Sequence, residues 1–268
     1  MRALSAFAAA LLVAACQTVQ TTGGGAVGVA REQTMLLSAD TVNRSAERAY
    51  RRTLAETARQ GRLDRDPEQV ARVRAIVERL VRVTGVFRAD APTWKWEAHV
   101  ITSKGVNAWC MPGGKIAVYT GLLERLAPSD DELAAVLGHE IAHALREHGR
   151  ERASQALAQQ LALTAIGLLA RVPEGTLDLT QTVLDLTFNL PNSRTHELEA
   201  DRIGVELAAR AGYDPRAAVT LWEKMQRRDR GSPPEFLSTH PSHETRIAEL
   251  RALAERVLPL YEQARGAR

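Results

Sequence analysis

His139-Glu140-Ile141-Ala142-His143 is the stretch that decides how the rest of this chain is interpreted. An α-helix has 3.6 residues per turn, so two residues four positions apart lie on the same face. On a helix, both imidazoles can bind one tetrahedral Zn²⁺, with Glu140 beside the open coordination position. Glu140 would be the base that takes a proton from water made more acidic by the metal. The pentapeptide alone also arises by chance, so its surroundings have to decide between a metal site and coincidence.

The residues around the pentapeptide predict a long, buried helix. Ser129-Asp130-Asp131-Glu132 has the form of a capping box, and acidic side chains favour the positive end of the helix dipole. A helix is therefore expected to begin at about Asp130. Apolar residues then recur at helical spacing, at Leu133, Val136, Leu137, Ile141, Ala144 and Leu145. The two histidines fall well inside this helix, where buried imidazoles need partners and a metal supplies one.

A catalytic zinc ion needs three protein ligands, so a third ligand has to come from elsewhere. One class of zinc peptidase has Gly three residues and His six residues after the second His of the motif, but this chain has Arg146 and Gly149 there. The other common solution is a Glu on a later helix. Glu197 and Asp201 lie four apart, so Glu197 would bind the metal and Asp201 would accept the second N–H of a ligating imidazole. On spacing alone Glu197 is only a candidate, and Glu199 is expected to be a charge in solvent.

The motif helix is expected to continue through Arg150. On it, His148 lies about 140° round from His143, so it should point away from the metal as a surface residue or a supporting group. The apolar run Gln155–Ala170 predicts a further helix, for which core packing is favoured over contact with a membrane or a hydrophobic substrate. Residues 173–191 are a break of uncertain structure, for which a mobile loop over the cleft is one interpretation.

The 268 residues, 45% hydrophobic and 25% charged, have an ordinary globular composition that can bury a sizeable core. The net charge is +3 and the sequence pI is near 9.1, with arginines dispersed among acidic residues. Nucleic acid would call for a clustered basic face, so it is not an expected partner. Cys110 is the one cysteine beyond the N-terminal region, so no intramolecular disulfide is expected.

Residues 1–15 are predicted to be a lipoprotein signal peptide. Ala3–Ala15 is an apolar run too short for an ordinary spanning helix, and Val13-Ala14-Ala15-Cys16 resembles a bacterial lipobox. The mature chain would begin at a lipidated Cys16, followed by a flexible tether over residues 16–30. A simple signal peptide or a short membrane anchor is the alternative. Gln17, by resemblance to known bacterial lipoproteins, favours the periplasmic side of the outer membrane.

Residues 31–268 are predicted to form one domain. It would start with a polar helix over Arg31–Arg62, followed by a helix that Asp66 caps. Trp94–Ile101 predicts a strand, and Asn107–Tyr119 predicts a hairpin with its turn at Pro-Gly-Gly.

Asn107 and Ala108 lie on the strand that leads to this hairpin. Zinc proteases commonly bind an extended substrate by pairing its backbone with such an edge strand. An ordinary sheet strand explains these residues equally well, so both interpretations stay open. Near the end of the chain, Asp214 starts a helix to about Arg228, and Glu244–Ala264 is the last predicted helix.

Several separated motifs together resemble the membrane-associated zinc metallopeptidase family of the CAAX prenyl endopeptidase, HtpX, the mitochondrial Oma peptidase and the periplasmic BepA, LoiP and YcaL proteins. They are Asn107-Ala108 to Gly121, His139 to His143, the SRxxExxAD pattern at Ser193 to Asp201, Gly212-Tyr213-Asp214-Pro215 and Ser238-Thr239-His240-Pro241. With its lipobox, the chain is most similar to the LoiP and YcaL lipoproteins. The resemblance implies a predominantly helical α+β fold of gluzincin type, with a small antiparallel sheet beside the HExxH helix.

The resemblance implies one Zn²⁺ per chain, held by His139, His143 and Glu197. Glu140 matches the family's base, and Asp201 matches the acid that supports a ligating imidazole. His240 matches a histidine that can stabilise the oxyanion, or swing in as an additional zinc ligand that holds the enzyme inactive. Arg246 would support the loop of His240 through a carboxylate.

The expected function is a zinc-dependent endopeptidase of the bacterial cell envelope, acting on misfolded or misassembled envelope proteins. Its expected partners are protein or peptide substrates, the membrane through the lipid anchor, and envelope assembly proteins. A chaperone or assembly factor for outer-membrane proteins with latent proteolysis is the first alternative. A metalloenzyme for a small amide, such as a peptidoglycan fragment, is the second. Glu140 favours catalysis, since a pure binding protein need not keep a base beside a metal.

Overall fold

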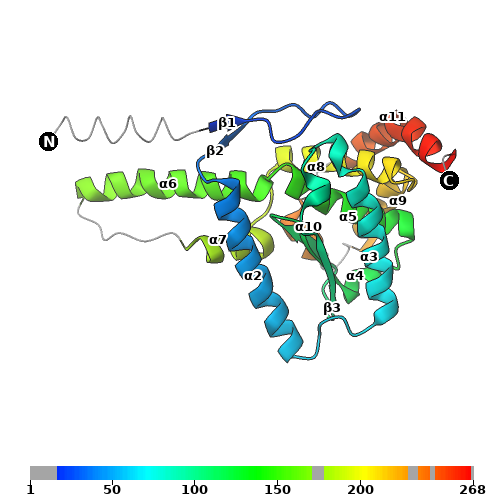
Figure 1. The fold of residues 1–268 in the computed structure, drawn as a ribbon, viewed down its shortest axis with the longest axis horizontal. Coiled ribbons are helices and arrows are strands. Elements are labelled where there is room, and N and C mark those ends of the chain that lie inside the picture. Colours follow the sequence, from blue (N-terminus) through cyan, green and yellow to red (C-terminus); the bar gives the residue numbers. More distant parts are fainter. Residues whose placement is uncertain (1–16, 171–177, 229–234, 242–244, 267–268) are drawn as a thin grey trace.

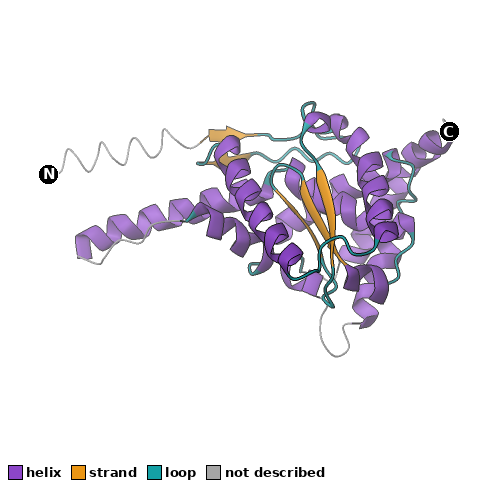
Figure 2. Ribbon diagram, turned by 60° about the horizontal axis from the view of Figure 1, so that its bottom comes forward, coloured by secondary structure: helices purple, strands orange, loops and turns teal. Residues whose placement is uncertain are grey.

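The computed structural model describes residues 17–170, 178–228, 235–241 and 245–266. Helices dominate these residues, and a three-stranded sheet lies among them (Figure 1, Figure 2). The predicted α+β, predominantly helical fold is confirmed. The predicted signal peptide and the lipidation site Cys16 lie outside the described residues.

The segment that follows residue 16 packs against the domain. Strands β1 (Gln17–Val19) and β2 (Gln33–Met35) form an antiparallel pair. Between them, Val27 and Val29 are buried in the main core. The prediction of a flexible tether is therefore wrong for residues 17–30, because burial of apolar side chains offsets the entropy lost when this stretch is ordered.

Helices α2 (Ala39–Arg59) and α3 (Pro67–Arg82) come next. The helix predicted over Arg31–Arg62 is shorter than expected, because the start of that range forms β2. The Asp66 carboxylate caps α3 by accepting two backbone N–H groups of its first turn. Two short 3-10 helices, η1 (Thr84–Val86) and η2 (Ala91–Thr93), then lead to the sheet.

The sheet contains β3 (Glu97–Ile101), β4 (Ala108–Met111) and β5 (Lys115–Tyr119), in the order β3-β5-β4. Strands β4 and β5 form the predicted antiparallel hairpin, but β3 runs parallel to β5. The prediction of an antiparallel sheet is thus right for the hairpin and wrong for β3, because β5 inserts between β3 and β4. Strand β4 lies at an edge of the sheet. Helix α2 packs on β5, where the Tyr50 hydroxyl donates to the Ile116 carbonyl oxygen over 3.0 Å.

Helices α4 (Thr120–Arg125) and α5 (Asp130–Leu145) follow the sheet. The predicted capping box of α5 is confirmed. The Ser129 hydroxyl accepts from the Glu132 N–H over 3.2 Å, and the Glu132 carboxylate accepts from the Ser129 N–H over 2.9 Å. The HExxH motif lies in the last two turns of α5.

Helix α5 ends shortly after the second histidine of the motif. Glu147 has a φ of +51°, a left-handed conformation that residues with a Cβ seldom adopt. This residue turns the chain, and α6 (His148–Ala170) begins at the next position. The predicted unbroken helix through Arg150 is therefore wrong. Of the two predicted places for His148, the surface residue is wrong and the supporting group fits, because His148 is buried against His143.

Helix α6 projects from the body of the molecule (Figure 1). From Gln155 to Ala162 its side chains are exposed or half-buried, so core packing is wrong for these residues. Helix α7 (Leu179–Phe188) packs beside α2 and α6 and replaces part of the break predicted over residues 173–191. Among the described residues, no helix is both long enough and apolar enough to cross a bilayer.

The rest of the described chain is helical: α8 (Arg194–Arg210), α9 (Ala217–Arg228), α10 (Glu235–Thr239) and α11 (Arg246–Gly266). Helices α5 and α8 cross in close contact at two glycines, Gly138 and Gly204. A Cβ atom on Gly204 would lie 2.7 Å from the His139 backbone nitrogen, so a larger residue does not fit without movement. This close crossing brings the HExxH motif against the face of α8 that carries Glu197 and Asp201.

Candidate active site

Four side chains that can bind a metal meet where α5, α8 and the end of α10 converge. They are His139 and His143 from α5, Glu197 from α8, and His240 directly after α10. Their ligand atoms all lie within 4.8 Å of one another, and all four residues are buried. The structure thus brings the three predicted metal ligands together with His240.

The contacts within this cluster fit a bound cation. The Nε2 atoms of His139 and His143 face each other over 3.1 Å, and each lies 3.3 Å from a carboxylate oxygen of Glu197. Asp201 accepts from His139 Nδ1 over 2.9 Å, so a neutral His139 presents a lone pair at Nε2. Nitrogen lone pairs and a carboxylate that point at one place are complementary to a cation. Two histidines and a glutamate are a common ligand set for catalytic zinc.

Arg246 holds the two carboxylates of α8. Its Nη1 lies 3.0 Å from Glu197 Oε2, and its Nη2 donates to Asp201 Oδ1 over 2.8 Å. Burial alone would raise the pKa of Asp201, but the charge of Arg246 and the hydrogen bond from His139 outweigh it and lower that pKa. Arg246 also donates to the Pro241 carbonyl oxygen over 3.3 Å, so it supports the segment after α10 as well.

Glu140 lies on α5 beside the cluster and is 2% exposed. Its Oε1 has no hydrogen-bond partner and lies 3.3 Å from His240 Nε2. Burial is the main cause that raises the pKa of Glu140. A carboxyl group with a raised pKa is suited to take up a proton and pass it on near neutral pH.

His240 stacks on Phe236, with their ring centroids 4.3 Å apart. Its Nδ1 lies 3.0 Å from Glu197 Oε1 and 3.2 Å from His139 Nε2. His240 therefore lies within reach of the potential metal ligands, and both of its predicted roles stay predictions. The same ring faces Glu140 with its other nitrogen, 3.3 Å from Oε1.

Glu199, predicted to be a charge in solvent, and His148, predicted to be a surface residue or a supporting group, are buried in contact with each other. His148 is 1% exposed and Glu199 is 6% exposed. Burial lowers the pKa of His148 to about 3, so its imidazole is neutral at physiological pH. The prediction of a solvent charge is wrong for Glu199, because Arg146 and Arg31 pair with it inside the protein. The sequence feature that could have indicated the burial of His148 is the set of polar residues directly after an otherwise buried helix.

The model of Peptidase family M48 matches residues 67–254, which is more than half of the chain. The chain belongs to peptidase family M48. This M48 chain is 34% identical to metalloendopeptidase OMA1, mitochondrial, of Bos taurus over 249 residues, which cover 87% of the chain and 46% of that protein. It is 36% identical to the mitochondrial metalloendopeptidase OMA1 of Schizosaccharomyces pombe over 220 residues, covering 80% of the chain and 61% of that protein.

A bacterial relative is the beta-barrel assembly-enhancing protease of Escherichia coli. The M48 chain is 31% identical to it over 189 residues, which cover 67% of the chain and 38% of that protein. The chain therefore spans less than two thirds of the length of each of these relatives. The family-level resemblance is confirmed, and similarity to the LoiP and YcaL type stays a prediction.

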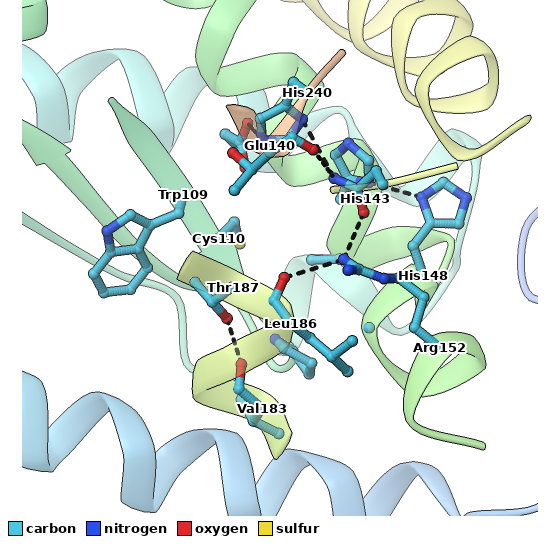
Figure 3. A pocket seen from close by; sticks show the side chains of 15 residues that line it. Trp109, Cys110, Glu140, His143, His148, Arg152, Val183, Leu186, Thr187 and His240 are labelled. Carbon is cyan, nitrogen blue, oxygen red and sulfur yellow. Dashed lines mark hydrogen bonds and ion pairs between the residues drawn. The ribbon is translucent and has the colours of Figure 1, made fainter. Parts of the chain in front are cut away.

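A cleft in the M48 chain opens beside Glu140 and His143, between β4 and α7 (Figure 3). Trp109 and Cys110 of β4 line one wall, and side chains of α7 line the opposite wall. Arg152 of α6 also lines the cleft. The cleft therefore combines apolar and polar side chains with Glu140 and two members of the cluster, His143 and His240.

The predicted substrate edge, Asn107 and Ala108, lies at the start of the edge strand β4 but not on the part of it that lines the cleft. Strand β4 is an edge strand, but Ala108 is buried and the Asn107 side chain donates to Glu235 over 3.2 Å. Neither residue lines the cleft, whereas the next two residues of β4, Trp109 and Cys110, do. The substrate-edge role of Asn107 and Ala108 stays a prediction.

Proposed function

We propose that the M48 chain is a zinc-dependent endopeptidase that hydrolyses peptide bonds of protein substrates. The observation that carries this proposal is the position of Glu140. This buried carboxyl group with an unpartnered oxygen lies beside a His-His-Glu cluster, at a cleft bounded by an edge strand. A metal site that only stabilised the fold would not need a base that opens onto a cleft.

A zinc ion held by His139, His143 and Glu197 would supply Lewis acidity, which polarises a carbonyl group and makes water more acidic. Glu140 takes the proton of the attacking water and passes it to the departing amine. The backbone of β4 holds the substrate in an extended conformation by adding it to the edge of the sheet. His240, once it moves away from Glu197, donates a hydrogen bond to the oxyanion.

The cellular setting of the proposed function is the periplasmic side of a bacterial outer membrane. The support is the lipobox-like Val13-Ala14-Ala15-Cys16 and the similarity to a bacterial protease named for β-barrel assembly. There, a chain tethered through a lipid on Cys16 would degrade misfolded or misassembled envelope proteins, as a member of the LoiP and YcaL type. A Cys16→Ser chain that stays in the membrane fraction as firmly as the parent would contradict the lipid anchor.

The test of the proposed activity is zinc content and casein cleavage by the full chain, compared with Glu140→Gln. We expect one zinc per chain in both proteins, and cleavage that is slower by about 10²- to 10⁴-fold in Glu140→Gln, the usual range for loss of a general base. Equal cleavage by both proteins would contradict the role of Glu140.

The position of His240 among the metal ligands favours one second candidate, a chaperone or assembly factor whose proteolysis is latent. If the parent binds zinc without cleaving casein, His240→Ala separates the two functions. Cleavage by His240→Ala would support a latent peptidase. Protection of an unfolded outer-membrane protein by Glu140→Gln would support the chaperone. Absence of cleavage by His240→Ala alone would not, because this variant also lacks the donor to the oxyanion.

A further inference from the structure

His148 lies against His143 and lines the cleft, and the proposed catalysis does not use it. It is the first residue of α6, directly after the left-handed Glu147, and is 1% exposed. Its Nδ1 lies 2.9 Å from His143 Nδ1, and its Nε2 lies 3.0 Å from Glu199 Oε2. Figure 3 shows His148 beside His143, on the side away from Glu140 and His240.

His143 and Glu199, at the two ends of this series, determine which atom donates in each of its two hydrogen bonds. His143 turns its Nε2 towards the other ligand atoms, so its one ring proton is on Nδ1 and is donated to His148. His148 then accepts at Nδ1 and carries its own proton on Nε2. That proton goes to Glu199, whose carboxylate can only accept. One tautomer of each imidazole satisfies all of these contacts.

Glu199 is held by two guanidinium groups. Arg146 Nε and Nη2 donate to its two oxygens over 3.1 and 3.2 Å. Arg31 Nε and Nη2 donate to the same two oxygens over 2.7 and 3.0 Å. Such paired contacts fix the plane of a carboxylate as well as its position. Glu199 is therefore a rigid acceptor for the proton of His148.

We propose that His148 and Glu199 are positioning residues for the metal ligand His143, and that together they fix its tautomer and ring orientation for zinc. The proposal rests on the metal site of the proposed function. It assigns to His143 the same kind of support that His139 receives from Asp201, with one imidazole inserted between ligand and carboxylate. Hydrogen bonds of this kind orient a ligating imidazole and raise its basicity.

Two other roles for His148 do not fit its contacts. A direct metal ligand is excluded, because His148 Nδ1 faces His143 Nδ1, the nitrogen that points away from the cluster. Simple packing would not require a polar ring here. An apolar side chain at position 148 would leave a buried N–H of His143 and a carboxylate oxygen of Glu199 without the hydrogen bonds that His148 provides.

The experiment measures zinc affinity of the full chain by chelator competition after removal of metal, for the parent, His148→Leu and His148→Gln. A Gln side chain can accept from His143 with its oxygen and donate to Glu199 with its amide, whereas Leu can do neither. We expect the zinc Kd to rise by about 10- to 100-fold in His148→Leu, the usual range for loss of such a support. We expect His148→Gln to recover most of that loss.

One further measurement and one control variant distinguish a loss of His143 positioning from a general effect of removing an imidazole. The absorption spectrum of the Co²⁺-loaded chain reports on ligand geometry, and we expect it to change in His148→Leu and to return towards the parent in His148→Gln. His99→Leu is the matched control, because it removes an imidazole that contacts the Asp64 carboxylate over 2.6 Å on β3, away from the cluster. It should leave both the zinc Kd and the Co²⁺ spectrum unchanged.

The outcomes are distinguishable. A parent chain that binds no zinc would overturn both the proposed function and the positioning role. A parent that binds zinc, with a His148→Leu chain of equal affinity and equal Co²⁺ spectrum, would overturn the positioning role alone. Equal losses in His148→Leu and His148→Gln would also overturn it, because they would show that hydrogen-bonding capacity at position 148 does not matter.

Discussion

The two histidines of α5 belong to one motif and one helix, yet the protein supports them differently. His139 contacts a carboxylate directly, since Asp201 accepts from its Nδ1 over 2.9 Å. His143 reaches the carboxylate of Glu199 only through His148. The direct contact comes from α8, which crosses α5 closely. The indirect one depends on the turn at the end of α5.

The outer ends of the two supports differ in their exposure to solvent. Behind Asp201 lies Arg246, whose side chain is fully buried. Behind Glu199 lie Arg146, whose side chain is fully buried, and Arg31 from the N-terminal segment, whose side chain is 33% exposed. Charges that reach water interact more weakly than charges that are buried together. We therefore expect the support of His139 to contribute more to stability and zinc affinity than the outer part of the support of His143.

The largest effect should come from Asp201→Ala, which removes the direct support. It leaves Arg246 with one buried carboxylate partner fewer, so we expect the free energy of unfolding to fall by about 3–5 kcal/mol. The zinc Kd should rise by about 10- to 100-fold. Chelator competition and urea unfolding measure the two quantities.

Glu206→Gln is the matched control for Asp201→Ala. Glu206 is a buried carboxylate on the same helix that pairs with Arg210 over 2.8 Å and accepts from the Val27 N–H over 3.0 Å. Glu206→Gln should lower the free energy of unfolding and leave the zinc Kd unchanged. If Glu206→Gln weakened zinc binding as much as Asp201→Ala does, the direct support would have no special role.

A smaller effect, which depends on pH, should come from Glu151→Gln at the outer end of the His143 support. Burial would raise the pKa of Glu151, but hydrogen bonds from Arg31, His196 and Gln33 outweigh it and hold that pKa well below its usual range. A carboxyl group whose pKa is lowered by folding stabilises the protein above its unfolded pKa of about 4.3, and this contribution is lost as the pH falls below that value.

We therefore expect Glu151→Gln to be less stable than the parent by about 1–2 kcal/mol at pH 7. The difference should shrink as the pH is lowered from about 4.3. Urea unfolding in EDTA measures it without a contribution from zinc release. A difference that stays constant from neutral to acidic pH would mean that the ionised form of Glu151 does not stabilise this region.

The smallest effect should come from Arg31→Met. Glu199 keeps Arg146, and Glu151 keeps Gln33 and His196, so we expect a loss of about 1 kcal/mol that decreases with added salt. The zinc Kd should rise by less than about tenfold. Differential unfolding at low and high salt, together with chelator competition, measures both.

Arg51→Met is the control for Arg31→Met, because Arg51 pairs with Glu47 over 2.6 Å on the exposed side of α2. It should leave zinc binding unchanged. A loss of zinc affinity in Arg31→Met as large as that in Asp201→Ala would erase the difference between the two supports, and would assign the N-terminal segment a direct part in building the metal site.

The support of His139 could be predicted from the sequence. For His143 the sequence offered only His148, as one of two interpretations, and not the rest of its support. Glu197 and Asp201 lie four residues apart, and the periodicity of α5 already placed the motif in a buried helix. The support of His143 depends on Glu147, a residue type with no preference for a left-handed conformation. It also depends on Arg31, which is 168 positions from Glu199 in the chain.

The sequence by itself determined the elements that local spacing controls. These are the capped α5 with its HExxH motif, the hairpin of β4 and β5, and the i, i+4 pair on α8, because helix and strand periods fix which side chains share a face. Only the tertiary structure decided the parallel pairing of β3, the helix α7 beside the cleft, the burial of Glu199 and the place of His148. The first three depend on contacts between separate segments of the chain, whose burial overrides local preference. The place of His148 depends on the left-handed Glu147 and on its contact with Glu199 of α8.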